Sequence, residues 1–249
     1  MTDMPNLVGG ALCLDFVNTV DPRHAPDRRE YLDSYPALTA WGRYAEAAAD
    51  QGDRLDKAAA GDPAAAGDPA GAGNPVEAGN PVEAGSPVEA GSSLAAGRVL
   101  GRAIRLREAL YPLFRGAARG QPPDPDDLGV LQAELTLALP HLRVTWSPAG
   151  FAREWERGSP ALDRVLWPVS WSAAELLTHG PLDRIRECPG QGNCGWLFLD
   201  LTKNASRRWC DMRVCGNRAK ARRHYTRTRQ EVGGAQGTQG GTRGGHRVR

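Results

Sequence analysis

Four cysteines near the C-terminal end constrain this 249-residue chain more than any other feature. They form two close pairs that are separated by fifteen residues: Cys188 and Cys194, then Cys210 and Cys215. Thiolates that bind zinc usually come as two such pairs, because each tight loop aims two sulfurs at one point. Turn residues lie within the first pair, and Gly216 and Asn217 follow the second. The spacing therefore predicts that these four residues bind one Zn²⁺ ion.

Two disulfides, or buried thiols that never meet, are the alternatives for the same four cysteines. The start of the chain, MTDMPNLVGG, has no basic segment followed by an apolar one, so we expect no signal peptide. Thiols stay reduced in the cytosol, which favours zinc over disulfides. Four cysteine ligands leave no coordination position for water, so we expect a structural metal and not a catalytic one.

Positive charge is concentrated around these cysteines. The segment 203–229 contains ten Lys and Arg and one acid, a net charge of +9, whereas the whole chain carries only +2. Its last part, from Asn217 to about Thr228, is rich in Ala, Arg and Lys and predicts a helix. Guanidinium groups pair with phosphates and read guanine edges, so this basic helix is a candidate nucleic-acid contact. The candidate contact residues are Arg207, Arg208, Asn217, Arg218, Lys220, Arg222, Arg223 and Arg227.

Several residues of this segment have a second interpretation. Asn217 and Arg218 could equally orient the metal loop, because thiolate sulfurs accept hydrogen bonds from nearby groups. We expect the aromatic residues Trp196, Phe198 and Trp209 to form the small core of a module that needs its metal to fold. Stacking of these rings on unpaired bases is the alternative.

The N-terminal part of the chain begins with a predicted helix over residues 11–20, where apolar residues recur at helical spacing. Cys13 lies among these apolar residues and is expected to be a core residue and not a nucleophile. Asp15 and Asn18 are polar positions within the same segment. We expect both to hydrogen-bond neighbouring backbone groups.

Further helices and one hairpin follow from local signals. Ser34 and Asp124 are predicted N-caps, each followed by a proline that suits a first helical turn. Residues 142–155 predict a small hairpin about a Ser-Pro-Ala-Gly turn. Apolar periodicity over residues 162–177 predicts a helix, or a helix pair interrupted at Pro168.

Low complexity marks an insertion and a tail. Glycine recurs every six residues from Gly61 to Gly91, with proline and few large aliphatic side chains. Such a sequence cannot bury enough apolar surface to offset the ordering entropy, so we expect residues 58–97 to be disordered. The Gly-rich tail, 231–249, carries the same expectation. The predicted domains are then 1–180 and 184–230.

The motifs also resemble a known family. The run CGWLFLD from Cys194, the run SRRWC from Ser206 and the run CGNRAKARR from Cys215 are similar to the CGNR zinc finger. The run LCLDFVNT from Leu12 resembles the opening of the ABATE domain, which usually precedes that finger. The resemblance implies a bacterial, stress-linked transcription regulator whose zinc finger contacts nucleic acid.

Together these features predict an α+β fold that is mainly α. We expect a helical N-terminal domain with a small β-hairpin, followed by a treble-clef-like zinc module made of a β-hairpin and a basic helix. The predicted function is a cytoplasmic, nucleoid-associated regulator that binds double-stranded DNA, without enzymatic activity or a membrane span. A protein-interaction module and an RNA or single-strand binder are the alternatives. The sequence leaves open whether the chain forms a homodimer and whether its N-terminal domain senses a small-molecule effector.

Overall fold

Helices dominate the residues that this computed structural model describes, which are 4–59, 87–190 and 194–235. The helices in this part of the chain are α1 (Leu12–Val17), α2 (Tyr35–Ala59), α3 (Pro87–Ala117), α4 (Pro125–Ala138), α5 (Leu166–His179) and α6 (Asn217–Ala235). Three antiparallel strand pairs accompany them: β1 (Val20–Asp21) with β2 (Arg29–Glu30), β3 (Leu142–Ser147) with β4 (Gly150–Trp155), and β5 (Ile185–Glu187) with β6 (Leu197–Leu199). The mainly helical fold with small hairpins is as predicted.

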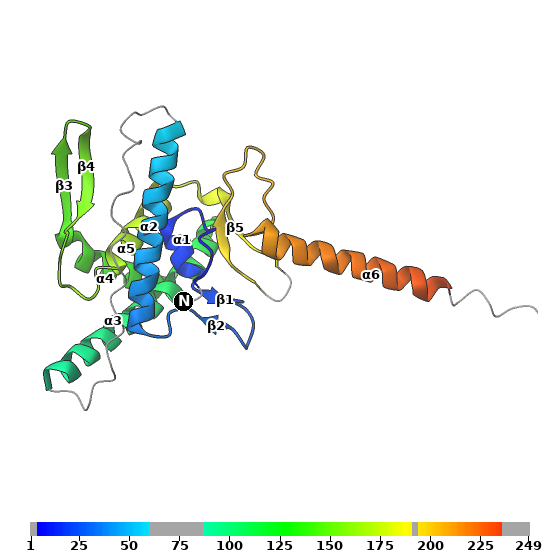
Figure 1. The fold of residues 1–249 in the computed structure, drawn as a ribbon, viewed down its shortest axis with the longest axis horizontal. Helices are drawn as coiled ribbons and strands as arrows, with labels where there is room; N and C mark the ends of the chain where they lie inside the picture. Colours follow the sequence, from blue (N-terminus) through cyan, green and yellow to red (C-terminus); the bar gives the residue numbers. More distant parts are fainter. Residues whose placement is uncertain (1–3, 60–86, 191–193, 236–249) are drawn as a thin grey trace, which may run out of the picture.

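The arrangement places α1 in the middle of the molecule (Figure 1). Helices α2, α3 and α5 surround α1, the hairpin β3–β4 projects on one side, and α6 extends away from the body on the other. A single π-helical turn, η4 (Met212–Gly216), leads into α6. None of the helices that the structure describes is long and apolar enough to cross a membrane.

The hydrophobic core is built around α1. Cys13, Leu14, Phe16 and Val17 are fully buried, and the Phe16 ring lies 5.2 Å from the ring of Trp41 in α2. A helix that is apolar on most of its sides must be covered by other elements, because burying each large apolar side chain stabilises the fold by about 1.5–3 kcal/mol relative to leaving it exposed. The same core continues into β6 through Leu197 and Leu199. The N-terminal body and the cysteine-bearing segment therefore share one core.

Local signals in the sequence start and connect the helices as predicted. Ser34 Oγ accepts a hydrogen bond from the backbone N–H of Ala37 at 3.3 Å, next to the start of α2. Asp124 caps α4 by accepting from the N–H of Asp126 at 2.8 Å. The predicted hairpin is β3–β4, in which Trp146 pairs with Phe151.

Several boundaries differ from the prediction. Helix α1 ends at Val17, and α2 and α3 extend into the predicted insertion, 58–97, of which residues 60–86 lie outside the described residues. Helix α3 begins at Pro87, because a proline in the first turn lacks only an N–H that would be unpaired there anyway. For the same reason Pro168 lies in the first turn of α5 and interrupts no helix. Helix α6 continues past Thr228, its predicted end, to Ala235; the rest of the predicted tail lies outside the described residues.

A buried charge network holds β2 against α3. Arg107 is 1% exposed, and its guanidinium donates to Glu30 Oε2 at 2.7 Å and to Glu108 Oε1 at 2.9 Å. Hydrogen bonds from Arg107 to Glu30 lower the pKa of this carboxyl group against the effect of its partial burial. The network satisfies a buried guanidinium, which is costly to leave without partners.

Asp15 in α1 should make stability depend on pH. Its carboxylate accepts from the N–H of Gly9 at 2.7 Å, but burial raises its pKa from 3.8 to about 6. The folded state therefore binds this proton more tightly than the unfolded state, and its stabilising contribution is lost as the pH rises from about 4 to 6. We expect Asp15→Asn to stabilise the fold by roughly 1–2 kcal/mol at pH 7, because the amide removes a charge that burial disfavours. The gain is smaller than the pKa shift alone would give, because the amide also loses the attraction of Arg207.

Urea unfolding at a series of pH values measures this effect. The stability difference between Asp15→Asn and the native chain is expected to grow between pH 4 and 6 and then to level off. Asp183→Asn is the matched control, because the Asp183 side chain is 85% exposed. A difference that stays constant across this range would contradict the account of Asp15.

Candidate metal centre and nucleic-acid interface

The structure brings the four predicted cysteines together. Cys188 and Cys194 come from the loop between β5 and β6, while Cys210 precedes η4 and Cys215 lies within it. All four side chains are buried, and their sulfur atoms lie within 4.8 Å of one another. The Sγ of Cys210 is 3.6 Å from that of Cys194 and 3.7 Å from that of Cys215.

These distances fit a tetrahedral metal ion. With zinc–sulfur bonds of about 2.3 Å, neighbouring sulfurs of a tetrahedral site lie about 3.8 Å apart. Without a metal ion the four sulfurs hydrogen-bond to one another, which lowers the pKa of Cys188 and raises the pKa of Cys210. A Zn²⁺ ion would take the place of the shared protons and leave four thiolates. With four sulfur ligands the site is closed, so the metal has a structural role and not a catalytic one.

The first cysteine loop needs a residue without a side chain at Gly190. A Cβ atom there would lie 2.7 Å from the Cβ of Cys194 and 2.9 Å from the Sγ of Cys215, which is too close for any other residue. Gly195, with a φ of +66°, turns the chain back toward β6, and its N–H donates to the carbonyl of Cys188 at 3.3 Å. The second pair is tied to the first because the N–H of Cys210 donates to the Sγ of Cys188 at 3.3 Å.

Asn18 fastens the metal module to the N-terminal body. Its amide nitrogen donates to the carbonyl of Leu197 at 2.8 Å, and its amide oxygen accepts from the N–H of Leu197 at 2.9 Å. Nearby, Trp196 Nε1 donates to the carbonyl of Val20 at 2.8 Å. Asn18 thus bonds backbone as expected, although the backbone is that of β6 and not its own neighbourhood.

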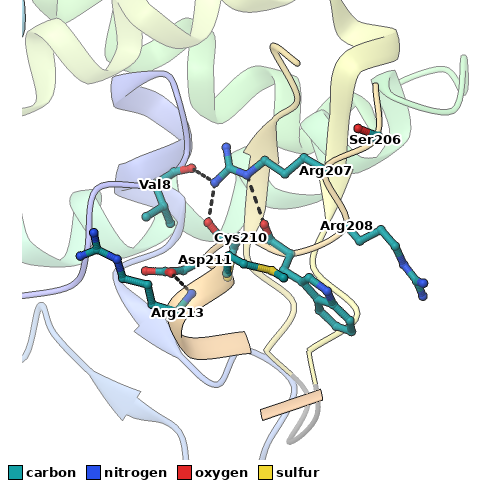
Figure 2. Close-up of a pocket in the computed structure, with 9 residues that line it drawn as sticks. Val8, Ser206, Arg207, Arg208, Cys210, Asp211 and Arg213 are labelled. Atoms are coloured by element: carbon teal, nitrogen blue, oxygen red, sulfur yellow. Dashed lines mark hydrogen bonds between the residues drawn. The ribbon is translucent and has the colours of Figure 1, made fainter. Parts of the chain in front are cut away.

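Arg207 also holds the metal module together and joins it to the N-terminal body. Its guanidinium donates to the carbonyls of Val8 at 2.9 Å, of Trp209 at 3.1 Å and of Cys210 (Figure 2). The guanidinium carbon lies 4.5 Å from the centre of the Phe198 ring. Because these donors are already taken, the geometry argues against the predicted nucleic-acid contact of Arg207. Figure 2 shows that Arg208 instead points away from the cluster.

The other predicted contact residues differ from Arg207 in their exposure. Asn217, Arg218, Lys220, Arg222 and Arg223 are exposed on the first turns of α6, whereas Ala219 packs this end of the helix and is 3% exposed. The side chain of Arg227 lies outside the described side chains. Among those described, Asn217 and Arg218 make no hydrogen bond to a cysteine sulfur, which favours contact with a partner over a role in orienting the metal loop.

The aromatic residues of the module form its small core. Phe198 is fully buried, Trp196 is 7% exposed, and Trp209 packs partly buried against the cysteines.

The fifth cysteine, Cys13, lies in α1 and is far in the sequence from the four clustered cysteines. Burial raises the pKa of its thiol to about 12. It is a neutral core residue, as expected.

Two positioning residues, Asn18 and Arg207, were not assigned to the scaffold from the sequence. Asn18 was expected to hydrogen-bond backbone groups near it in the sequence, and Arg207 was predicted to contact nucleic acid. A signal existed for Asn18, because a polar residue within an apolar helix must find a buried partner.

Comparison with protein families gives two matches along this chain. Residues 10–180 match the ABATE family, described as "putative stress-induced transcription regulator". Residues 184–228 match the CGNR zinc finger. A search of curated proteins finds no match.

Proposed function

Because this chain belongs to the ABATE family and ends in a CGNR zinc finger, we propose that it regulates transcription by binding double-stranded DNA through α6. The zinc ion folds the module and fixes the start of α6, while the helical body holds the module in place. Such a protein acts in the cytoplasm, at the bacterial nucleoid. The metal itself takes no part in a reaction, and the family is one of transcription regulators and not of enzymes.

One observation carries this proposal: α6 projects from the body (Figure 1), and the cations on its first turns are exposed. An α-helix with its side chains is about 10–12 Å wide, which matches the major groove of about 12 Å. Among the described residues no acid forms an ion pair with Arg218, Lys220, Arg222 or Arg223. The proposed contact set is therefore Arg208, Asn217, Arg218, Lys220, Arg222, Arg223 and Arg227, without Arg207.

Two alternatives compete with this proposal. A single-strand binder would stack bases on exposed rings; Trp196 and Phe198 are buried in the module core, which leaves Tyr225 on α6 and the partly buried Trp209 for that role. A protein-interaction module would use the same basic helix on an acidic protein surface. It predicts little affinity for free duplex DNA, so the next experiment separates it from the proposal.

The double substitution Arg222→Ala/Arg223→Ala tests the proposal. We expect it to weaken binding to duplex DNA by roughly tenfold to a hundredfold, because two cations that neutralise phosphates or read bases are lost. The slope of log affinity against log salt is expected to fall by about 2. Fluorescence anisotropy of labelled duplexes over a salt series measures both quantities.

The matched control removes two exposed arginines from the body, as Arg43→Ala/Arg157→Ala. It changes the net charge equally and should leave affinity and slope close to native values. Equal binding by all three proteins, or no duplex binding by the zinc-loaded native chain, would contradict the proposal. A preference for single strands would favour the alternative.

A further inference from the structure

A cavity of about 270 Å³ lies between the N-terminal body and the zinc module. Asp21 and Tyr31 line it from the region of β1 and β2, while Trp196, Val214, Cys215 and Arg218 line it from the module. Pockets for drug-sized ligands usually measure about 300–1,000 Å³, so this cavity suits a smaller molecule. It touches both the metal cluster and the first turn of α6.

Two opposite charges face this cavity without meeting. Asp21 and Arg218 both line it, yet within the described part of the chain neither side chain has a hydrogen bond or an ion pair. Partial burial raises the pKa of Asp21, and the nearby charge of Arg218 is the largest influence that lowers it. The charges of Asp21 and Arg218 therefore interact without a direct contact, and a molecule bound in the cavity can bridge them.

The remaining wall of the cavity is mixed. Asn6 and Asp211 add polar groups, the metal-binding cysteines Cys194, Cys210 and Cys215 add sulfur atoms, and one part is apolar. Trp196 offers its ring and no polar group, because its Nε1 already donates to the carbonyl of Val20 at 2.8 Å. Val214 and Met4 add aliphatic surface on the same wall. A ligand with a negative group for Arg218, a positive group for the acidic side at Asp21 and Asp211, and a short apolar side chain for Trp196 and Val214 would match this lining.

We propose that this cavity binds a free amino acid with an apolar side chain. Its carboxylate pairs with Arg218, its ammonium group pairs with Asp21, and its side chain packs on Trp196 and Val214. Both charged pairs replace contacts with water by contacts within a partly enclosed site, where ion pairs are stronger than at an open surface. No covalent or redox step is involved.

Binding of the amino acid in this cavity would lower the affinity of α6 for DNA. Arg218 lies in the first turn of α6, so a ligand that engages its guanidinium withdraws one cation from the DNA-contacting surface. By linkage, DNA and the amino acid then lower each other's affinity by the same factor. This regulatory step rests on the proposed function, whereas binding of the amino acid does not.

Thermal unfolding of the zinc-loaded full chain with each of the twenty L-amino acids at millimolar concentration is the first test. We expect at least one apolar amino acid to raise the melting temperature, and calorimetric titration then gives its affinity. The N-acetyl and the amide derivatives of that amino acid, which each lack one charge, are expected to bind on the order of tenfold to a hundredfold more weakly. The variant Asp21→Asn is expected to lose affinity by a similar factor.

Zinc content is measured for every variant, so that loss of the metal is not mistaken for loss of the ligand site. The control Asp183→Asn removes an exposed acid elsewhere and should bind normally. No amino acid bound at millimolar concentration, or equal binding by Asp21→Asn and Asp183→Asn, would overturn the proposal. If ligand binding fails while the α6 double variant still loses DNA affinity, only this inference falls. If the ligand binds and duplex DNA does not, the proposed function falls instead.

Discussion

Replacing Cys210 with serine is expected to abolish the zinc site and to destabilise the whole body, not the C-terminal module alone. The Cys210 sulfur lies 3.6 Å and 3.7 Å from two other cysteine sulfurs, and the N–H of Cys210 bonds to a third. The module is joined to the main core through Leu197 and Leu199 of β6, which pack with α1. Loss of the metal therefore loosens a strand that covers the centre of the molecule.

The expected size of this effect is large. Structural zinc contributes about 10–16 kcal/mol of apparent folding free energy in isolated zinc-finger peptides. Part of the burial of β6 against α1 survives without the metal, so we expect a smaller loss here, at least about 3–5 kcal/mol. Zinc content by mass spectrometry and urea unfolding followed by tryptophan fluorescence measure the two consequences.

Cys13→Ala is the matched control for this experiment. Cys13 is fully buried in α1 and belongs to the main core, so its loss should cost some stability and leave one zinc ion per chain. A Cys210→Ser protein that keeps a full zinc ion would contradict the four-cysteine site. A separate transition confined to the C-terminal module, with the rest unfolding as in the native chain, would contradict the shared core.

Asn18→Ala is expected to cost about 2–4 kcal/mol of stability. The substitution leaves both the N–H and the carbonyl of Leu197 buried without partners, and each unpaired group costs about 1–3 kcal/mol. Zinc should still bind, because among the described residues the Asn18 side chain hydrogen-bonds to Leu197 and to no cysteine. Hydrogen exchange of the β6 amides, together with urea unfolding, measures the loosening of this strand.

Asn204→Ala is the control, since Asn204 is exposed in the loop that follows β6. It should unfold like the native chain. If Asn18→Ala were equally stable, the paired hydrogen bonds to Leu197 would not be what joins the body to the module. The Asn18→Ala substitution therefore tests a single contact between residues 10–180 and residues 184–228.

The metal site was predictable because its signal is local. The two cysteines of each pair are close in the sequence, so the spacing alone indicated the ligand set. The caps Ser34 and Asp124 and the β3–β4 hairpin were predictable for the same reason, since each depends on a few consecutive residues. The basic helix followed from composition, although its end did not, because α6 continues through Gly233 and Gly234, which disfavour a helix, to Ala235.

Long-range contacts explain what the sequence did not reveal. Asn18 and Leu197 are 179 positions apart, and no periodicity within α1 indicates that partner. Arg207 was grouped with the other arginines because charge does not tell whether a guanidinium is already bonded to backbone carbonyls. The cavity at Asp21 and Arg218 likewise exists only once β1 and the start of α6 are brought together.

The most direct test of the central account is selection of bound duplexes from a random DNA pool by zinc-loaded full-length protein. We predict that the native chain enriches a defined sequence, and that Arg222→Ala/Arg223→Ala and Cys210→Ser each fail to enrich it. Recovery of an unselected pool by the native protein, at a salt concentration where the zinc site remains intact, would contradict the claim that α6 reads duplex DNA.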